Sequence, residues 1–195
     1  PLIELLAAEP LPAEPFAAWQ AARGDSGREI RVVISGVGKV AAAAATANLL
    51  SRNPIGRLIN FGVCGALADR DDLNPGALCQ VITAVEGDRL CMGDRSPVPV
   101  PCHQMDAADI TTADLVTVDR PVFDAGRRKA LSALGQLVDM EGAAIARTAA
   151  WFGAPCTLLK GVSDAAGEGD RQRLQTKLDG VAADLATLLL RLLAV

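Results

Sequence analysis

The stretch LVDMEGAAIA, residues 137–146, reads as a buried strand that passes directly into a buried helix. Two acids, Asp139 and Glu141, flank Met140 within it. Carboxylates on apolar elements are costly to desolvate unless they are paired or used. We therefore expect these two acids to be paired inside the fold or to take part in function.

On both sides of this stretch, short apolar runs alternate with Ala/Leu-rich helical patterns, which predicts an α/β domain with a largely parallel sheet. The runs are LIELLAA (2–8), IRVVISGV (30–37), RLINFGV (57–63), ALCQVITAV (77–85), QLVDM (136–140) and CTLLKGVS (156–163).

Three helices are clear from their patterns. Val40–Ser51 is almost entirely small and apolar, which predicts a helix packed on both sides. Asp124 is the expected N-cap of the next helical pattern, AGRRKALSAL. From Leu174 to Leu192 apolar residues recur at three- and four-residue steps, which predicts a helix that begins after Asp170 and covers one face of the sheet.

Composition limits the possible partners. The chain has 195 residues, enough for one domain, and a net charge of -4 with scattered basic residues, which argues against nucleic acid. No apolar run approaches the roughly 20 residues that span a bilayer. Residues 1–6 lack the features of a signal peptide, so we expect a cytoplasmic protein.

Other residues give weaker signals. The five cysteines form no CxxC pair and mostly lie in apolar contexts, so we predict neither a disulfide framework nor a metal site. His103 lies in a Pro-rich stretch and is assigned no role. Residues 87–112 are irregular in pattern and predict a long loop, either functional or simply mobile.

Two glycine-containing turns follow predicted strands. SGVGKV (35–40) places Gly36 and Gly38 between a predicted strand and a predicted helix. NFGVCGAL (60–67) likewise has glycines at the end of the next predicted strand. Such turns let backbone approach a ligand, and N–H groups at a helix start attract anions. A tight turn alone explains either one. A Rossmann-like nucleotide site is disfavoured because the third glycine and a ribose-binding acid are absent.

Three acids complete the pattern. Glu141 follows one predicted strand, Asp164 ends KGVSD (160–164), and Glu14 follows the first apolar run. Each has a structural explanation, as a loop cap, a helix start or a helix-dipole partner. Because all three and both glycine turns are expected at the same end of the sheet, they predict a small-molecule site there.

Four of these segments together resemble a known family: SGVGKVAAAAAT, INFGVCGALADRDDLNPGAL, VDMEGAAIA and GVSDAA. They are similar to the motifs of the nucleoside phosphorylase/nucleosidase superfamily, especially the methylthioadenosine/S-adenosylhomocysteine nucleosidases. The resemblance implies a phosphorylase-like fold, a single domain over residues 1–195 with three α/β/α layers around a mixed, largely parallel, twisted sheet. It also implies cleavage of the N-glycosidic bond of a purine nucleoside, a homodimer, and no metal or organic cofactor.

The resemblance assigns the acids to roles. Asp164, oriented by Ser163, would hydrogen-bond the purine and help to protonate its N7. Glu141 would hold the ribose hydroxyls and favour a cationic sugar, with Met140 packed on the ribose. Glu14 would position and deprotonate the water, although Glu9 lies close enough to compete.

Further residues are expected to line the site on the same grounds. They are Gly36, Gly38, Val63, Gly65, Val122, Phe123 and Asp139.

The nucleophile is the least determined feature. Phosphorylases of the family resemble RVGSCG where this chain has NFGVCG, so Asn60 and Val63 replace the arginine and serine that hold phosphate. This favours hydrolysis. Phosphorolysis, including that of an adenosyl-modified lipid precursor, stays open if Arg23, Arg52 or a partner subunit's arginine restores the phosphate site. A catalytically degenerate nucleoside-binding protein is the third alternative.

Overall fold

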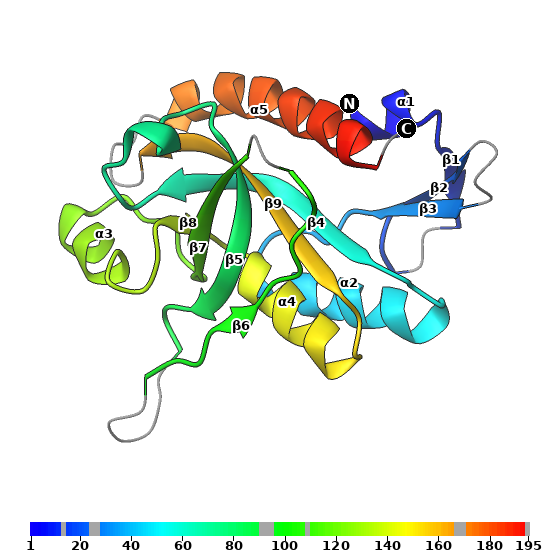
Figure 1. Cartoon of the computed structure of the whole chain (residues 1–195), viewed down its shortest axis with the longest axis horizontal. Coiled ribbons are helices and arrows are strands. Elements are labelled where there is room, and N and C mark those ends of the chain that lie inside the picture. Colours follow the sequence, from blue (N-terminus) through cyan, green and yellow to red (C-terminus); the bar gives the residue numbers. More distant parts are fainter. Residues whose placement is uncertain (13–14, 24–27, 90–95, 108–109, 166–170, 194–195) are drawn as a thin grey trace.

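The computed structural model describes residues 1–12, 15–23, 28–89, 96–107, 110–165 and 171–193, and it has the α/β/α layering expected from the sequence. A central sheet lies between α5 on one face and α4, backed by α2, on the other (Figure 1). The helices are α1 (Leu2–Leu5), α2 (Lys39–Arg52), α3 (Ala125–Leu131), α4 (Gly142–Trp151) and α5 (Arg171–Leu192), with a 3-10 turn η2 (Asp71–Leu73). The strands are β1 (Glu9–Leu11), β2 (Ala18–Arg23), β3 (Arg28–Val33), β4 (Leu58–Ala66), β5 (Leu78–Glu86), β6 (Val100–Pro101), β7 (Thr111–Thr117), β8 (Leu137–Asp139) and β9 (Cys156–Ala165).

The central sheet is mixed and closes on itself. Its strand order is β6-β5-β7-β8-β4-β9, and β5 also pairs with β9, which joins the two sides into a ring. Strands β5, β7 and β8 run parallel to one another, and β4 runs parallel to β9. The two groups meet antiparallel at β4–β8 and at β5–β9. The parallel pairing expected from the sequence therefore occurs in two groups of opposite direction.

A separate three-stranded antiparallel sheet, β1-β2-β3, lies at the end of the molecule opposite α3 (Figure 1). The predicted strand at residues 30–37 contributes to β3, in this sheet and not in the central one. The prediction of a strand at residues 2–8 is wrong, because this segment forms α1. Leu2 and Leu6, four residues apart and so on one helical face, both pack into the apolar cluster around Leu185 of α5.

Helix α5 covers one face of the sheet as predicted, although Asp170, its expected cap, lies outside the described residues. Val181 and Leu185 pack over Leu159 of β9. A Cβ atom at Gly161 would lie 2.2 Å from Val181 Cγ1, so this glycine permits the close approach of helix and strand. In the part of the chain that the structure describes, no helix is long and apolar enough to cross a membrane.

The helix predicted at Val40–Ser51 is present as α2, but it is not packed on both sides. Within the single chain it packs against α4, and its buried residues are Ala42, Ala45 and Thr46. Val40 on the opposite side is 85% exposed, so the expectation of packing on both sides fails for one isolated chain.

The smaller predictions concern a cap and a loop. The Asp124 cap is confirmed, since its Oδ1 accepts a hydrogen bond from Arg127 N at 2.8 Å. Residues 87–112 are largely irregular where described, but they also contain β6 and the start of β7.

Candidate active site

Strand register brings three predicted site segments together. Gly65 of β4 pairs with Val138 of β8 on one side and with Asp164 of β9 on the other. We expected the acids at one sheet end because the carboxyl ends of parallel strands share an edge. That expectation is wrong for β8, which runs antiparallel to β4. The segments meet because of the register, which places β8 and β9 on the two sides of Gly65.

The first glycine turn directly contacts Glu141. Gly36 and Gly38 have φ angles of 78° and 93°, in the left-handed region that favours glycine. The backbone N–H of Gly38, the N-cap of α2, donates to Glu141 Oε1 at 2.7 Å. An anion was expected at this helix start, and the structure supplies one from the chain itself.

Glu141 is half-buried, and its burial raises the pKa of the carboxyl above its ordinary value. The Gly38 N–H opposes this shift by stabilising the ionised form, while Asp139 raises and Lys160 lowers the pKa. A carboxyl in this environment remains responsive to small changes in its hydrogen bonds.

Ser163 and Asp164 form the second polar pair, at the end of β9. Ser163 is buried, and its Oγ lies 2.6 Å from Asp164 Oδ2 and 3.1 Å from the Cys64 carbonyl oxygen. Asp164 itself is only partly buried. The hydroxyl thus fixes the orientation of a carboxylate that keeps access to solvent.

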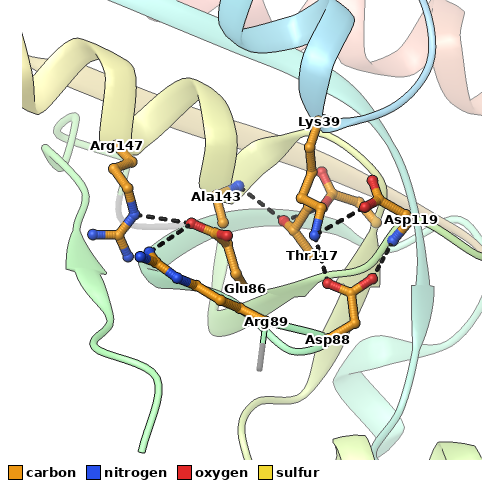
Figure 2. Close-up of polar contacts among 9 residues, drawn as sticks. Lys39, Glu86, Asp88, Arg89, Thr117, Asp119, Ala143 and Arg147 are labelled. Carbon is orange, nitrogen blue, oxygen red and sulfur yellow. Dashed lines mark hydrogen bonds and ion pairs between the residues drawn. The ribbon is translucent and has the colours of Figure 1, made fainter. Parts of the chain in front are cut away.

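Both carboxylate oxygens of Asp139 have partners inside the protein. Its Oδ2 lies 2.9 Å from Lys160 Nζ and accepts from Gly142 N at 2.8 Å, and its Oδ1 accepts from Thr117 Oγ1 at 2.6 Å. Thr117 Oγ1 in turn accepts from Ala143 N at 2.8 Å (Figure 2). Asp139 therefore holds the first turn of α4, directly after Glu141.

Sequence reasoning missed Lys160 and Thr117. The Lys160 side chain is 2% exposed, and its Nζ also donates to Asn60 Oδ1 at 2.8 Å. Burial disfavours its charge, but Asp139, with smaller contributions from Cys64 and Glu141, raises the pKa of Lys160 above its ordinary value. A lysine inside the apolar run at residues 156–163 was the available signal, since buried lysines are normally paired.

The remaining candidates divide by environment. Met140 is half-buried beside Glu141. Val122 is buried in the cluster near α3, while Phe123 beside it is 46% exposed. Val63 packs toward the α5 cluster.

Two glutamates are candidates for the acid that activates the water. Glu14 lies outside the described residues. Its competitor Glu9 is exposed on β1, in the separate three-stranded sheet.

The chemistry of the described site is that of carboxylates, a hydroxyl and backbone N–H groups. Across the described ranges, no group of three or more His, Cys, Asp or Glu side chains is arranged to hold a metal ion. Asp164 and Glu141 can exchange protons and bind hydroxyl or ring N–H groups of a ligand.

Known proteins are similar to this chain over most of its length. The sequence pattern of the phosphorylase superfamily matches residues 2–194. A 5'-methylthioadenosine/S-adenosylhomocysteine nucleosidase of Chromohalobacter salexigens is 26% identical over 183 residues, with 82% of this chain and 77% of the relative covered.

Solved structures with the same fold cover nearly the entire chain. A futalosine hydrolase mutant of Helicobacter pylori has a TM-score of 0.87 at 21% identity, covering 99% of this chain and 92% of the other. The 5'-methylthioadenosine/S-adenosylhomocysteine nucleosidase of H. pylori with butyl-thio-DADMe-Immucillin-A gives 0.88 at 22% identity, covering 99% and 91%. The Neisseria meningitidis nucleosidase with methylthio-immucillin-A gives 0.84 at 22% identity, covering 98% and 94%.

The link between Asp139 and α4 depends on the absence of a side chain at Gly142. A Cβ atom there would lie 2.4 Å from Leu115 Cδ2 and 2.9 Å from Asp139 Oδ2. Gly142→Ala should lower the free energy of unfolding by about 1–3 kcal/mol, as overpacking of a core does. Urea unfolding followed by circular dichroism measures this change.

Gly180→Ala is the matched control, because nothing lies within 4 Å of a Cβ atom at this exposed position of α5. It should stabilise the protein by about 0.5–1 kcal/mol. Equal stability of the Gly142→Ala variant and the wild type would contradict the described packing.

Proposed function

The chain belongs to the phosphorylase superfamily, and we propose that it hydrolyses the N-glycosidic bond of a methylthioadenosine- or S-adenosylhomocysteine-like purine nucleoside. The observation that carries this proposal is the placement of Glu141 and Asp164 on neighbouring segments of one site, each oriented by a hydrogen bond. The nucleosidase relative from C. salexigens supports hydrolysis as the reaction.

The two carboxylates match the requirements of the reaction. Breaking an N-ribosyl bond passes through a cationic, oxocarbenium-like sugar, as in glycoside hydrolysis. Asp164, oriented by Ser163, assists protonation of the purine N7 and so makes the base a better leaving group. Glu141 binds the ribose hydroxyls and stabilises the positive sugar, and Met140 packs against the ribose.

For the water nucleophile we assign Glu14 as the base. This assignment rests on the family resemblance, and its competitor Glu9 is exposed on β1. Asp139 acts differently from its predicted role as a substrate contact. Since both of its oxygens already accept hydrogen bonds inside the protein, it positions Glu141 instead.

Asn60 and Lys160 favour hydrolysis over phosphorolysis. Asn60 holds the position of the phosphate-binding arginine in the resembling phosphorylases, and here its oxygen is bonded to Lys160. The Lys160 charge is balanced by Asp139 and is nearly inaccessible. Arg52 is the last residue of α2, about 20 Å from Gly38 at 1.5 Å per residue, and so does not replace the missing guanidinium within the chain.

Base release from a panel of nucleosides tests the proposal. Methylthioadenosine, S-adenosylhomocysteine, futalosine, adenosine and inosine are incubated with the protein, with and without phosphate, and products are separated by chromatography. We expect free purine and free sugar without phosphate from a 5'-thio-substituted substrate. Release only with phosphate, giving a sugar 1-phosphate, would overturn hydrolysis.

Substitution of the two carboxylates separates chemistry from binding. Asp164→Asn should lower kcat by about 10²–10⁴-fold through loss of proton donation, while nucleoside binding by calorimetry persists. Glu141→Gln should lower kcat/KM by about 10²-fold or more, because charge stabilisation of the sugar is lost. Asp184→Asn, exposed on α5, serves as control. Unchanged turnover in the Asp164 variant would remove it from the mechanism.

The pH dependence follows from burial of Glu141. Its ionised form is needed and its pKa is raised, so activity is present above this pKa and is lost as pH falls through it. The acidic limb of kcat/KM should therefore lie at higher pH than for an exposed glutamate. A limb at or below the usual glutamate range would contradict this assignment.

We also propose that the enzyme is a homodimer that buries the outer face of α2 and α4. Val37, Val40 and Trp151 are 78%, 85% and 76% exposed, an unusual density of large apolar side chains for a free surface. Val40 and Trp151 also line an open pocket of about 250 Å³, together with other residues of α2 and α4 and with Glu86 and Asp119.

A charge on this face should disrupt the dimer. Val40→Glu is expected to convert a dimer to a monomer in size-exclusion chromatography with light scattering, since an unpaired carboxylate is costly to bury. Leu5→Glu, at a 55% exposed position of α1, should leave the mass unchanged. A wild-type protein that is monomeric at micromolar concentration would refute the proposal.

A further inference from the structure

Lys39 joins three chain segments through ion pairs with Asp88 and Asp119 (Figure 2). Its Nζ lies 2.5 Å from Asp88 Oδ1, just after β5, and 3.1 Å from Asp119 Oδ2, just after β7. Asp119 N donates to Asp88 Oδ2 at 2.6 Å, which completes the cluster. We call Lys39, Asp88 and Asp119 the Lys39 clamp.

The clamp is directly connected to the proposed ribose-binding group. Lys39 follows Gly38, whose N–H donates to Glu141 Oε1. On the other side, Val118 precedes Asp119 and donates its N–H to the carbonyl oxygen of Asp139 at 3.0 Å. The contacts therefore form a closed circuit from Glu141 through the glycine turn and the clamp back to β8.

The clamp also fixes the segment that carries Val122 and Phe123, two of the residues expected to line the site. Val122 and Phe123 follow Asp119 by three and four residues. The ends of β5 and β7 are held close at this point, since Gly87 N donates to the Thr117 carbonyl oxygen at 2.9 Å. One ammonium group thus links the glycine turn that contacts Glu141 to the segment that carries Val122 and Phe123.

We propose that Lys39 is a positioning residue for the nucleosidase site, holding the Gly38 N–H against Glu141 and the 118–123 segment in register with it. This inference rests on the proposed function for its kinetic consequence. Its structural consequence, the protection of two backbone amides, does not depend on any activity.

The charges of the clamp persist across the neutral range. Burial opposes the charge on Lys39, but its bonds to Asp88 and Asp119 outweigh burial and raise its pKa. Partial burial also opposes ionisation of Asp88, but Lys39 and the Asp119 N–H outweigh it and lower the Asp88 pKa. Around Glu141 itself, Asp139 and Lys160 act in opposite directions and pair with each other. A shift in the acidic limb of the pH profile of kcat/KM therefore reports on the ionisation of Glu141 and on its hydrogen bond to Gly38.

The first arm of the test is hydrogen exchange in the unliganded protein. In Lys39→Met, the amides of Gly38 and Asp119 should exchange about tenfold or more faster than in the wild type, because local opening becomes easier. Lys39→Arg keeps a cation that can reach both carboxylates and should retain protection. Lys129→Met, at an exposed position of α3, is the control. Unchanged exchange of both amides in Lys39→Met would overturn the proposal.

The second arm is kinetic. Lys39→Met should lower kcat/KM about ten- to a hundredfold, as misplacement of a binding group does. The acidic limb should move to higher pH, because Glu141 loses the N–H that favours its ionised form. Simple loss of folded enzyme would reduce kcat and leave both KM and the limb unchanged, which would contradict positioning.

Asp88→Asn provides a second variant if Lys39→Met folds poorly. It keeps an acceptor for the Asp119 N–H but removes the charge that faces Lys39, so we expect the same changes at smaller size. If the wild type releases no base from any nucleoside, the proposed function fails, and the exchange arm still decides the role of Lys39.

Discussion

The ion pair between Asp139 and Lys160 is the contact on which the site depends. Their side chains are 1% and 2% exposed, so each would be a buried, uncompensated charge without the other. Removing one member of such a pair typically costs about 3–5 kcal/mol, even where the intact pair adds little net stability. The pair ties the middle of β9 to the end of β8, and bonds from Thr117 and Gly142 to Asp139 extend it to β7 and α4.

This interior network determines the positions of Glu141 and Asp164. Glu141 begins α4 immediately after the segment that Asp139 holds, and Asp164 lies four residues beyond Lys160 on the same strand. A small displacement of β8 relative to β9 would therefore change the distance between the Glu141 and Asp164 carboxylates. Gly142 permits the arrangement, because any side chain at that position would collide with Leu115 and with Asp139 itself.

The sequence predicted the layers of the fold better than the connections between its elements. Strand and helix patterns are local, so β4, β5, β8, β9, α2 and α5 were recognisable. The α1 segment was misread because a short apolar run does not distinguish a strand from a helix packed on α5. No local pattern encodes contacts between residues far apart in sequence, such as Thr117 with Asp139. The sequence therefore did not show the antiparallel β4–β8 pairing or the contacts of Lys160, Thr117 and Lys39.

The most direct test of the account is a crystal structure of the protein with an adenine nucleoside analogue that carries a cationic nitrogen in the sugar ring. We expect both ribose-type hydroxyls to contact the Glu141 carboxylate, which keeps its bond to Gly38, and the purine N7 to lie within hydrogen-bond distance of Asp164. An analogue bound with neither carboxylate in contact, or bound elsewhere on the molecule, would contradict it.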